Sequence, residues 1–256
     1  EYVSIQWLHF APEGLAHRDE IAWMAGRAAE MEPGLAEIAA RHGIAMLAGT
    51  APAPAPVAGR FVNQARLFLP EGGPEGDVAR QDKLCLTPSE KDPEGWHLAT
   101  GDAFRVVEWR GLRLGIAICL DVELPALSAR IAGLGLDLLL VPSMTELASG
   151  HARVFGCAKA RAIELFCAVG AVGLIGDVVR PDRVEGNTSG AAVFLPCEEA
   201  LGYTGVLGEI PPASSTTDPD GPLLVTSVPV GLIRRLRTEK AEVWPGAWAA
   251  QHVSIG

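Results

Sequence analysis

Cys119 is the residue of this sequence best placed to do chemistry. It ends the almost uncharged run LGIAIC, and Asp121 follows two residues later. A free cysteine behaves as a small hydrophobe and is often buried, so packing alone would explain it. A thiol at the carboxyl end of a buried strand also lies where open α/β sheets place reacting groups. The residues around Cys119 leave both interpretations open, and a nucleophile needs partners elsewhere in the chain.

Lys83 and Glu1 are the partners that the sequence offers to Cys119. None of the six histidines forms a recognisable Cys-His signature. Lys83 stands in the polar segment QDKLCLTPSEK, and Glu1 opens an apolar segment. A carboxylate can take the thiol proton and later activate water, while an ammonium lowers the thiol pKa and faces the oxyanion. A Glu, Lys and Cys set therefore predicts attack on an amide-like carbon without a metal ion or a cofactor.

The amino-terminal half of the chain reads as alternating strands and helices. We expect a strand-like segment at 1–10, two helical pieces divided by Pro33 within 16–42, and a strand at 44–50. A tight hairpin with its turn at Arg110 and Gly111 then joins two strands, the second of which leads into Cys119. This hairpin would bring Cys119 to the end of a buried strand.

The segments after Cys119 predict a βαβ unit that continues into a second one. The helix ELPALSARIAGLG is followed by the apolar strand LDLLLVPS, and ARVFGCAKARAIEL by FCAVGAVGLI. Three stretches are loop-like by composition, namely 51–59, 71–77 and 208–222. None of them separates blocks of different composition. We therefore expect a single α/β domain over 1–256.

The amino-acid composition and net charge limit the kinds of molecule that this protein is expected to bind. The chain has 256 residues, is 48% hydrophobic and carries a net charge of -10, with a pI near 5.1. An acidic chain lacks the basic face that nucleic acids and anionic membranes require, and no apolar stretch is long enough to cross a bilayer. Five cysteines without metal-ligand spacing indicate a reducing compartment, so we expect a cytoplasmic protein. Apart from Cys119, we expect the cysteines to be packing residues.

Several separated motifs resemble those of the carbon-nitrogen hydrolase, or nitrilase, superfamily. They follow the order of the family along nearly the whole chain: EYVSIQWL, VNQARLFLP, QDKLCLTPSE, LGIAICLDVELP, DLLLVPS, RVFGCAKARAIE and SGAAVFLP. The likeness is greatest to the amidase-like branch that includes domains fused to acetyltransferases. It implies a four-layer α-β-β-α sandwich and a homodimer or larger homo-oligomer. It also implies that the family's first strand and helix, which normally precede the glutamate, are missing from this chain.

The resemblance also implies a role for each candidate residue. Glu1 would be the general base, Lys83 the oxyanion stabiliser and Cys119 the nucleophile. The implied supporting and substrate-binding residues are Glu90, which orients the lysine, Leu120, whose backbone N–H completes the oxyanion hole, Glu123 and Thr145. The expected enzyme hydrolyses a linear, non-peptide amide or carbamoyl C–N bond of a small molecule through a cysteine thioester.

Departures from the family pattern keep alternatives open. Leu120 stands where an aromatic residue is common, and Cys85 where this branch often has histidine. A non-catalytic ligand-binding or regulatory domain of the same fold is one alternative, and a nitrile-hydrolysing or acyl-transferring enzyme is another. Asp121, where true nitrilases typically have glutamate, favours an amide. Asp121 and Glu123 could instead cap the following helix.

Two helices are the expected dimer interface. Segments 124–133 and 152–165 carry few charges for exposed helices, and the second includes Val154, Phe155 and Ile163. A helix that is apolar on more than one side needs a second surface to pack against. We therefore expect these helices to form a twofold contact.

Overall fold

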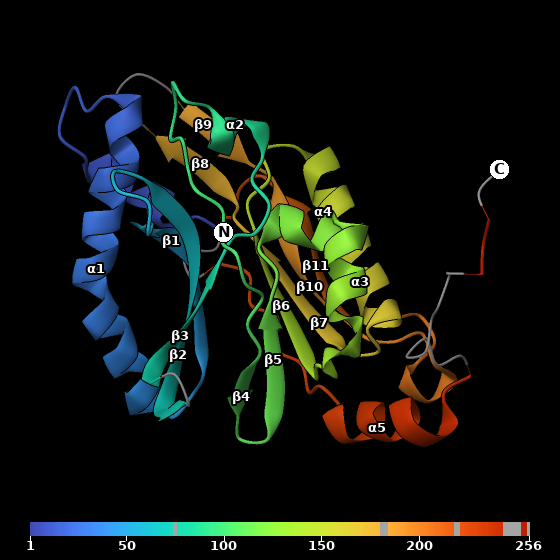
Figure 1. Cartoon of the computed structure of the whole chain (residues 1–256). Coiled ribbons are helices and arrows are strands. Elements are labelled where there is room, and N and C mark those ends of the chain that lie inside the picture. The colour runs from blue at the N-terminus through green and yellow to red at the C-terminus, as the bar shows by residue number, and fades with distance from the viewer. Residues whose placement is uncertain (74–75, 180–183, 218–220, 243–251, 255–256) are drawn as a thin grey trace.

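Two β-sheets face each other at the centre of the computed structural model, and helices cover their outer faces (Figure 1). The structure describes residues 1–73, 76–179, 184–217, 221–242 and 252–254. From one side to the other, the layers are helix α1, a three-stranded sheet, a six-stranded sheet, and helices α3 and α4 (Figure 1). The predicted α-β-β-α sandwich is confirmed.

The smaller sheet is antiparallel and lies under α1 (His17–His42). Its strands are, in order, β1 (Met46–Pro54), β2 (Phe61–Gly73) and β3 (Gly76–Asp82). Helix α1 buries Ile21, Met24 and Ala28, whose spacing of three and four residues places them on one face. The helix ends at Gly43, whose φ of 63° is the left-handed conformation that glycine adopts without strain.

The larger sheet has a parallel centre with antiparallel flanks. Its strands are, in order, β11 (Val206–Ala213), β10 (Ser189–Phe194), β7 (Ala168–Gly173), β6 (Leu138–Ser143), β5 (Leu112–Ile116) and β4 (Val107–Trp109). Strands β5, β6 and β7 are parallel, and α3 (Pro125–Ile131) and α4 (Ala148–Glu164) connect them as predicted. The carboxyl ends of these strands therefore meet at one edge of the sheet, where a site is expected.

Shorter elements complete the chain. They are the 3-10 helices η1 (Val3–Phe10), η2 (Cys119–Glu123), η3 (Ala132–Leu134) and η4 (Glu199–Leu201), the helix α2 (Pro88–Lys91), the two-stranded sheet of β8 (Gly176–Val179) and β9 (Val184–Asn187), the helix α5 (Val230–Arg235) and the π-helix η5 (Leu236–Lys240). Within the ranges that the structure describes, no helix combines the length and the apolar character needed to cross a membrane.

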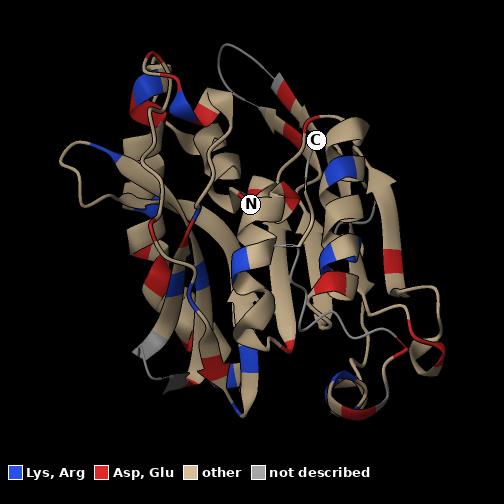
Figure 2. Ribbon diagram, turned by 45° about the vertical axis from the view of Figure 1, so that its right-hand side comes forward, with Lys and Arg blue, Asp and Glu red and all other residues tan. Residues whose placement is uncertain are grey.

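Charged residues lie on the outer layers rather than between the sheets. Figure 2 shows acidic and basic bands along α4, while the central strands of the larger sheet are nearly free of both colours. The core between and around the sheets is apolar and includes Leu67, Ile116, Leu139 and Val169. The few charged groups buried between the sheets therefore need a specific explanation, because burying a charge is costly unless it is paired.

The amino-terminal segment and the long helix differ from the sequence prediction. Residues Val3–Phe10 form a 3-10 helix instead of a strand, because Ile5 and Leu8 are the apolar residues that reach the core and their spacing of three suits this helix. Helix α1 continues through Pro33. The loss of one hydrogen bond there is offset by packing of the helix against β1 and β2.

Two of the predicted loops are partly strand. Ala51–Pro54 belong to β1, and the segment from 208 onwards begins within β11. Both strands lie at the edge of their sheet, where a proline leaves no ladder hydrogen bond unmade. The third predicted loop, 71–77, is the tip of the β2–β3 hairpin, and its residues 74–75 lie outside the described residues, as do residues 218–220 of the long segment.

The apolar residues of α4 are mostly used within the fold. Val154 and Phe155 are buried, and Phe155 packs edge-on against Phe194 of β10 at 6.4 Å between ring centroids. The expectation that these two side chains need a second protomer is therefore wrong. Ile163 is 43% exposed and is the apolar residue of this helix that remains available to a partner. Arg161 and Glu164 form an ion pair within the helix.

Candidate active site

Cys119 stands at the carboxyl edge of the larger sheet, in a strained backbone position. Strand β5 ends at Ile116, and Cys119 begins the 3-10 helix η2 with a φ of 47°. A non-glycine residue in the left-handed region costs free energy, and such residues gather at functional sites. The thiol is 6% exposed, and Sγ lies 3.7 Å from the carbonyl oxygen of Met144, just after β6. The turn thus holds the sulfur at the junction of two strand ends.

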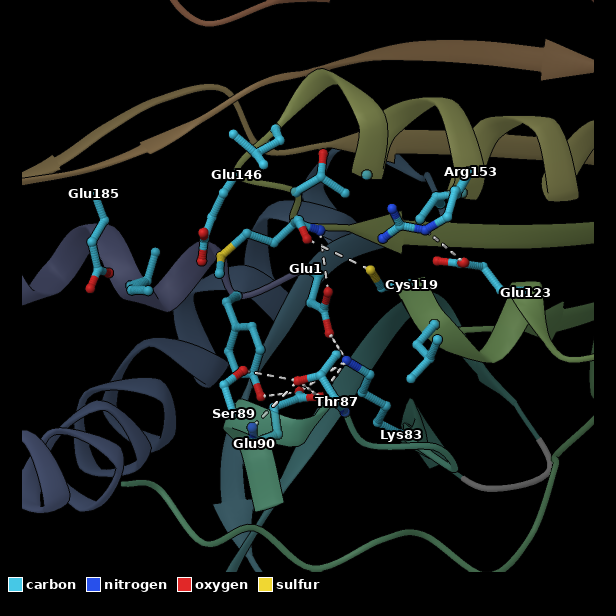
Figure 3. Close-up of a pocket in the computed structure, with 18 of the residues that line it drawn as sticks. Glu1, Lys83, Thr87, Ser89, Glu90, Cys119, Glu123, Glu146, Arg153 and Glu185 are labelled. Atoms are coloured by element: carbon cyan, nitrogen blue, oxygen red, sulfur yellow. Dashed lines mark hydrogen bonds and ion pairs between the residues drawn. The ribbon is translucent and has the colours of Figure 1, made fainter. Parts of the chain in front are cut away.

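Lys83 is a buried ammonium held between two carboxylates. Nζ donates to Glu1 Oε1 at 2.6 Å and to Glu90 Oε1 and Oε2 at 2.9 and 2.8 Å. The residue is 1% exposed and follows directly after β3. Burial by itself would lower the pKa of Lys83, but the two carboxylates outweigh it and raise that pKa. The lysine is therefore a fixed positive charge (Figure 3).

Glu90 is oriented by the short helix α2 as well as by Lys83. Its Oε2 accepts from the Thr87 backbone N–H at 2.8 Å and from Thr87 Oγ1 at 3.0 Å, which completes a capping box. Tyr2 Oη donates to Glu90 Oε1 at 2.6 Å. Burial would raise the pKa of Glu90, but Lys83 and these donors lower it. Glu90 is thus an ionised group that several hydrogen bonds hold in one position.

Glu1 points its carboxylate from the amino-terminal segment into the same place. Its backbone nitrogen donates to the Ser143 carbonyl at 3.0 Å. Besides Lys83, Oε1 accepts from Asn63 Nδ2 at 2.7 Å, and Oε2 accepts from the Met144 backbone N–H at 3.2 Å. The carboxylate and the thiol of Cys119 thus share Met144 as a neighbour, one through its N–H and the other through its carbonyl. The structure therefore brings together all three residues of the predicted set.

The thiol of Cys119 is neutral at rest. Burial and the neighbouring Glu1 carboxylate raise its pKa, and the Lys83 ammonium only partly opposes them. The Lys83 ammonium lowers the pKa of this thiol as expected, but burial and the Glu1 carboxylate outweigh it. A thiol in this state needs a base to take its proton during attack.

Asp121 ties the cysteine turn to the lysine loop. Its Oδ1 accepts from the Cys85 backbone N–H at 2.8 Å and from that of Leu84 at 3.2 Å, while Oδ2 accepts from Ile118 at 3.1 Å. The carboxyl group is 2% exposed, and burial raises its pKa to about 6. Of the two roles left open for Asp121, the geometry supports a structural one, since its oxygens face backbone groups.

The reacting groups open onto one cavity of about 450 Å³. Glu1, Lys83, Glu90 and Cys119 line it, as do the predicted supporting residues Leu120, Glu123 and Thr145. Glu123 pairs with Arg153 of α4 at 3.2 Å, and Figure 3 shows this pair on the Cys119 side of the cavity.

Thr145 is placed at the cavity but its hydroxyl is engaged. Its Oγ1 donates to the Thr188 carbonyl at 2.7 Å, which leaves the hydroxyl oxygen as an acceptor.

The described residues contain no group of three or more potential metal ligands.

Sequence reasoning missed four residues of the site. They are Tyr2, Asn63, Met144 and Arg153. One signal was available for Asn63, which is a polar residue at a core-facing position of a strand between Val62 and Ala65. Met144 contacts Glu1 and Cys119 through its backbone groups, so its side-chain type could not reveal these contacts. Conversely, the expectation that the other four cysteines are packing residues is wrong for Cys197, which is exposed. Cys85 and Cys157 are half-buried, and Cys167 is buried.

Comparison with known proteins identifies the family. The family model described as "Carbon-nitrogen hydrolase" matches residues 6–226. The chain belongs to the carbon-nitrogen hydrolase family. Its curated relatives include a probable hydrolase, YhcX, of Bacillus subtilis, 27% identical over 73% of this chain and 36% of that protein, and an (R)-stereoselective amidase of a Pseudomonas species, 42% identical over 32% of this chain and 27% of that protein. The matches span only about a third of the length of these relatives.

Solved structures share the fold of this carbon-nitrogen hydrolase. An amidase from Nesterenkonia sp. AN1 superposes with a TM-score of 0.56 at 23% identity, over 83% of this chain and 72% of that one. Saccharomyces cerevisiae Nit3, described as a member of branch 10 of the nitrilase superfamily, gives a TM-score of 0.58 at 17% identity, over 81% and 69%. At sequence identities of 23% and 17%, the structural similarity indicates a shared fold and does not extend to function.

Proposed function

We propose that this protein is a thiol amidohydrolase that cleaves a linear, non-peptide amide or carbamoyl C–N bond of a small molecule. The observation that carries the proposal is the convergence of the Cys119 thiol, the Glu1 carboxylate and the Lys83 ammonium on one cavity. Membership of the carbon-nitrogen hydrolase family supports the reaction class. Additional support comes from the Nesterenkonia amidase, whose active-site cysteine is described as bonding covalently to acrylamide and to the acetamide moiety of fluoroacetamide.

The first half of the reaction forms a thioester. Glu1 takes the proton of the neutral Cys119 thiol as the sulfur attacks the carbonyl carbon. Negative charge develops on the substrate oxygen, which the Lys83 ammonium and the backbone N–H of Leu120 stabilise. Glu1 then gives its proton to the leaving nitrogen, so ammonia or an amine departs and the acyl group stays on sulfur. Glu90 keeps Lys83 in place throughout.

The second half returns the enzyme to its starting state. Glu1 removes a proton from a water molecule that attacks the thioester carbon, and Lys83 again faces the oxyanion. The C–S bond breaks, the thiolate regains the proton from Glu1, and a carboxylic acid is released. A nitrile-hydrolysing or acyl-transferring enzyme would use the same thioester and differ in what enters or leaves, so analysis of the products distinguishes these outcomes.

Ammonia release from small linear amides, measured with three proteins, tests this function. We expect turnover by the wild type and by Cys197→Ala, and loss of at least about 1,000-fold in Cys119→Ala, because Cys119 is the one thiol among the described residues that line the cavity. Cys197 is the matched control because it is the exposed thiol. Treatment with fluoroacetamide should add one acetamide moiety at Cys119. Turnover by a folded Cys119→Ala protein would refute the proposal.

A further inference from the structure

We propose that Asn63 is a positioning residue of this site, which holds the Glu1 carboxylate so that Oε2, rather than Oε1, accepts the proton of the Cys119 thiol. The inference rests on the proposed function and adds to it a residue that does not touch the cavity.

The two oxygens of the Glu1 carboxylate have different surroundings. Oε1 accepts from Lys83 Nζ at 2.6 Å and from Asn63 Nδ2 at 2.7 Å. Oε2 accepts a longer bond, from the Met144 backbone N–H at 3.2 Å. Because a carboxylate oxygen has two lone-pair sites, Oε1 is filled and Oε2 keeps one free. Oε2 is therefore the oxygen that can act as the base.

Asn63 reaches Glu1 from the smaller sheet without facing the substrate. Asn63 lies in β2 and is fully buried. Its backbone carbonyl accepts from the Lys83 backbone N–H at 2.8 Å. The same ladder thus places Asn63 and Lys83 side by side. Asn63 is not among the described residues that line the cavity. Any effect of Asn63 on the reaction must therefore pass through Glu1 or Glu90.

The amide of Asn63 is oriented for this role at a cost to the fold. Nδ2 faces two carboxylates, at 2.7 Å from Glu1 and 3.4 Å from Glu90, whereas Oδ1 has no hydrogen-bond partner in the described part of the chain. Turning the amide over would direct its oxygen at the carboxylates, so the donor must face them. A buried unpartnered oxygen destabilises a protein. A position that served packing alone would be better filled by an apolar side chain, as at the neighbouring Val62 and Ala65.

Asn63→Leu tests the inference, since leucine has the same number and branching of side-chain heavy atoms and removes both the donor and the unpartnered oxygen. We expect Cys119 alkylation by fluoroacetamide at neutral pH to be about tenfold slower, because the carboxylate that takes the thiol proton is no longer held in place. In turnover of a small linear amide, kcat should fall by about tenfold or more while KM changes less than about twofold.

Gln64→Ala is the matched control. The Gln64 side chain also donates an amide hydrogen bond to a carboxylate, at 2.7 Å to Asp82, but it does not line the cavity or contact Glu1. We expect its alkylation rate and kcat to match the wild type. Urea unfolding of each protein checks the fold, and Asn63→Ala provides a second donor-free variant with a smaller side chain.

The outcomes separate this inference from the proposed function. Slower alkylation and a lower kcat with a nearly unchanged KM in Asn63→Leu or Asn63→Ala, and not in Gln64→Ala, support the role of Asn63. Wild-type rates of alkylation and turnover in the Asn63 variants would overturn this inference and leave the proposed function standing. A Cys119 that stays unlabelled in the wild type would overturn both.

Discussion

Asp121 should make the stability of this protein fall as pH rises through the range of its raised pKa. The carboxyl group is 2% exposed, and burial raises its pKa from 3.8 to about 6 although three backbone N–H groups favour the ionised form. The folded protein therefore binds this proton more tightly than the unfolded chain does. Stability from this source is complete below the unfolded pKa of 3.8 and is lost as pH rises through about 6.

The magnitude follows from the two pKa values of Asp121. A difference of about two units corresponds to about 3 kcal/mol, since each unit is about 1.4 kcal/mol. Most of this change falls between about pH 4 and pH 7. Asp121→Asn keeps the shape of the side chain but removes the titration. The difference in unfolding free energy, wild type minus variant, should therefore decrease by about 3 kcal/mol across this window.

Urea unfolding of both proteins at a series of pH values measures this difference. Every other titrating group is common to the two proteins, so its contribution cancels in the comparison. The test uses only the change of this difference with pH. The free energies of the hydrogen bonds that asparagine makes or loses therefore need not be known. A difference that stays constant between pH 4 and pH 7, or that increases with pH, would refute the reasoning about the buried Asp121 carboxyl.

Three further predictions follow from the same geometry. Glu90→Gln removes one of the two carboxylates that hold the Lys83 ammonium, so kcat/KM for amide hydrolysis should fall by about 100-fold; a change below about threefold would contradict the role of Glu90. Arg161→Ala removes a buried donor to the Val122 carbonyl and should lower the unfolding free energy by about 2 kcal/mol in urea, whereas an unchanged midpoint would count against it. We propose that the protein forms a homodimer through α4, so light scattering should give twice the chain mass for the wild type and the monomer mass for Ile163→Glu; a monomeric wild type would remove this proposal.

Much of the fold was predictable because its central strands are continuously apolar. The residues from Leu138 to Ser143 and from Ala168 to Ala171 are buried or half-buried on both faces, and such runs indicate parallel strands joined by helices. The errors arose where tertiary packing overrides local preference. Pro33 reads as a helix break and Pro52 as a loop residue, yet a helix packed on a sheet and an edge strand accommodate them.

The site was predictable only for side chains that carry chemistry. Cys119, Lys83 and Glu1 have reactive groups and stand in recognisable motifs, so their convergence could be expected. The backbone groups of Met144 and the left-handed conformation of Cys119 have no signature in residue type. The charge balance was also hidden, because the pKa of Cys119 depends on its burial and on its distances from Glu1 and Lys83. Sequence spacing does not give burial or distances.

The covalent intermediate on Cys119 is the most direct test of the proposed mechanism. The wild-type protein is mixed with an excess of a small linear amide, quenched in acid during turnover, and analysed by intact mass and peptide mapping. The mechanism predicts a species heavier by the acyl group, which is the amide less ammonia, on the peptide that contains Cys119, and no such species in Cys119→Ala. Ammonia release by the wild type with no acylated Cys119 at any quench time, or an unchanged rate in Cys119→Ala, would contradict it.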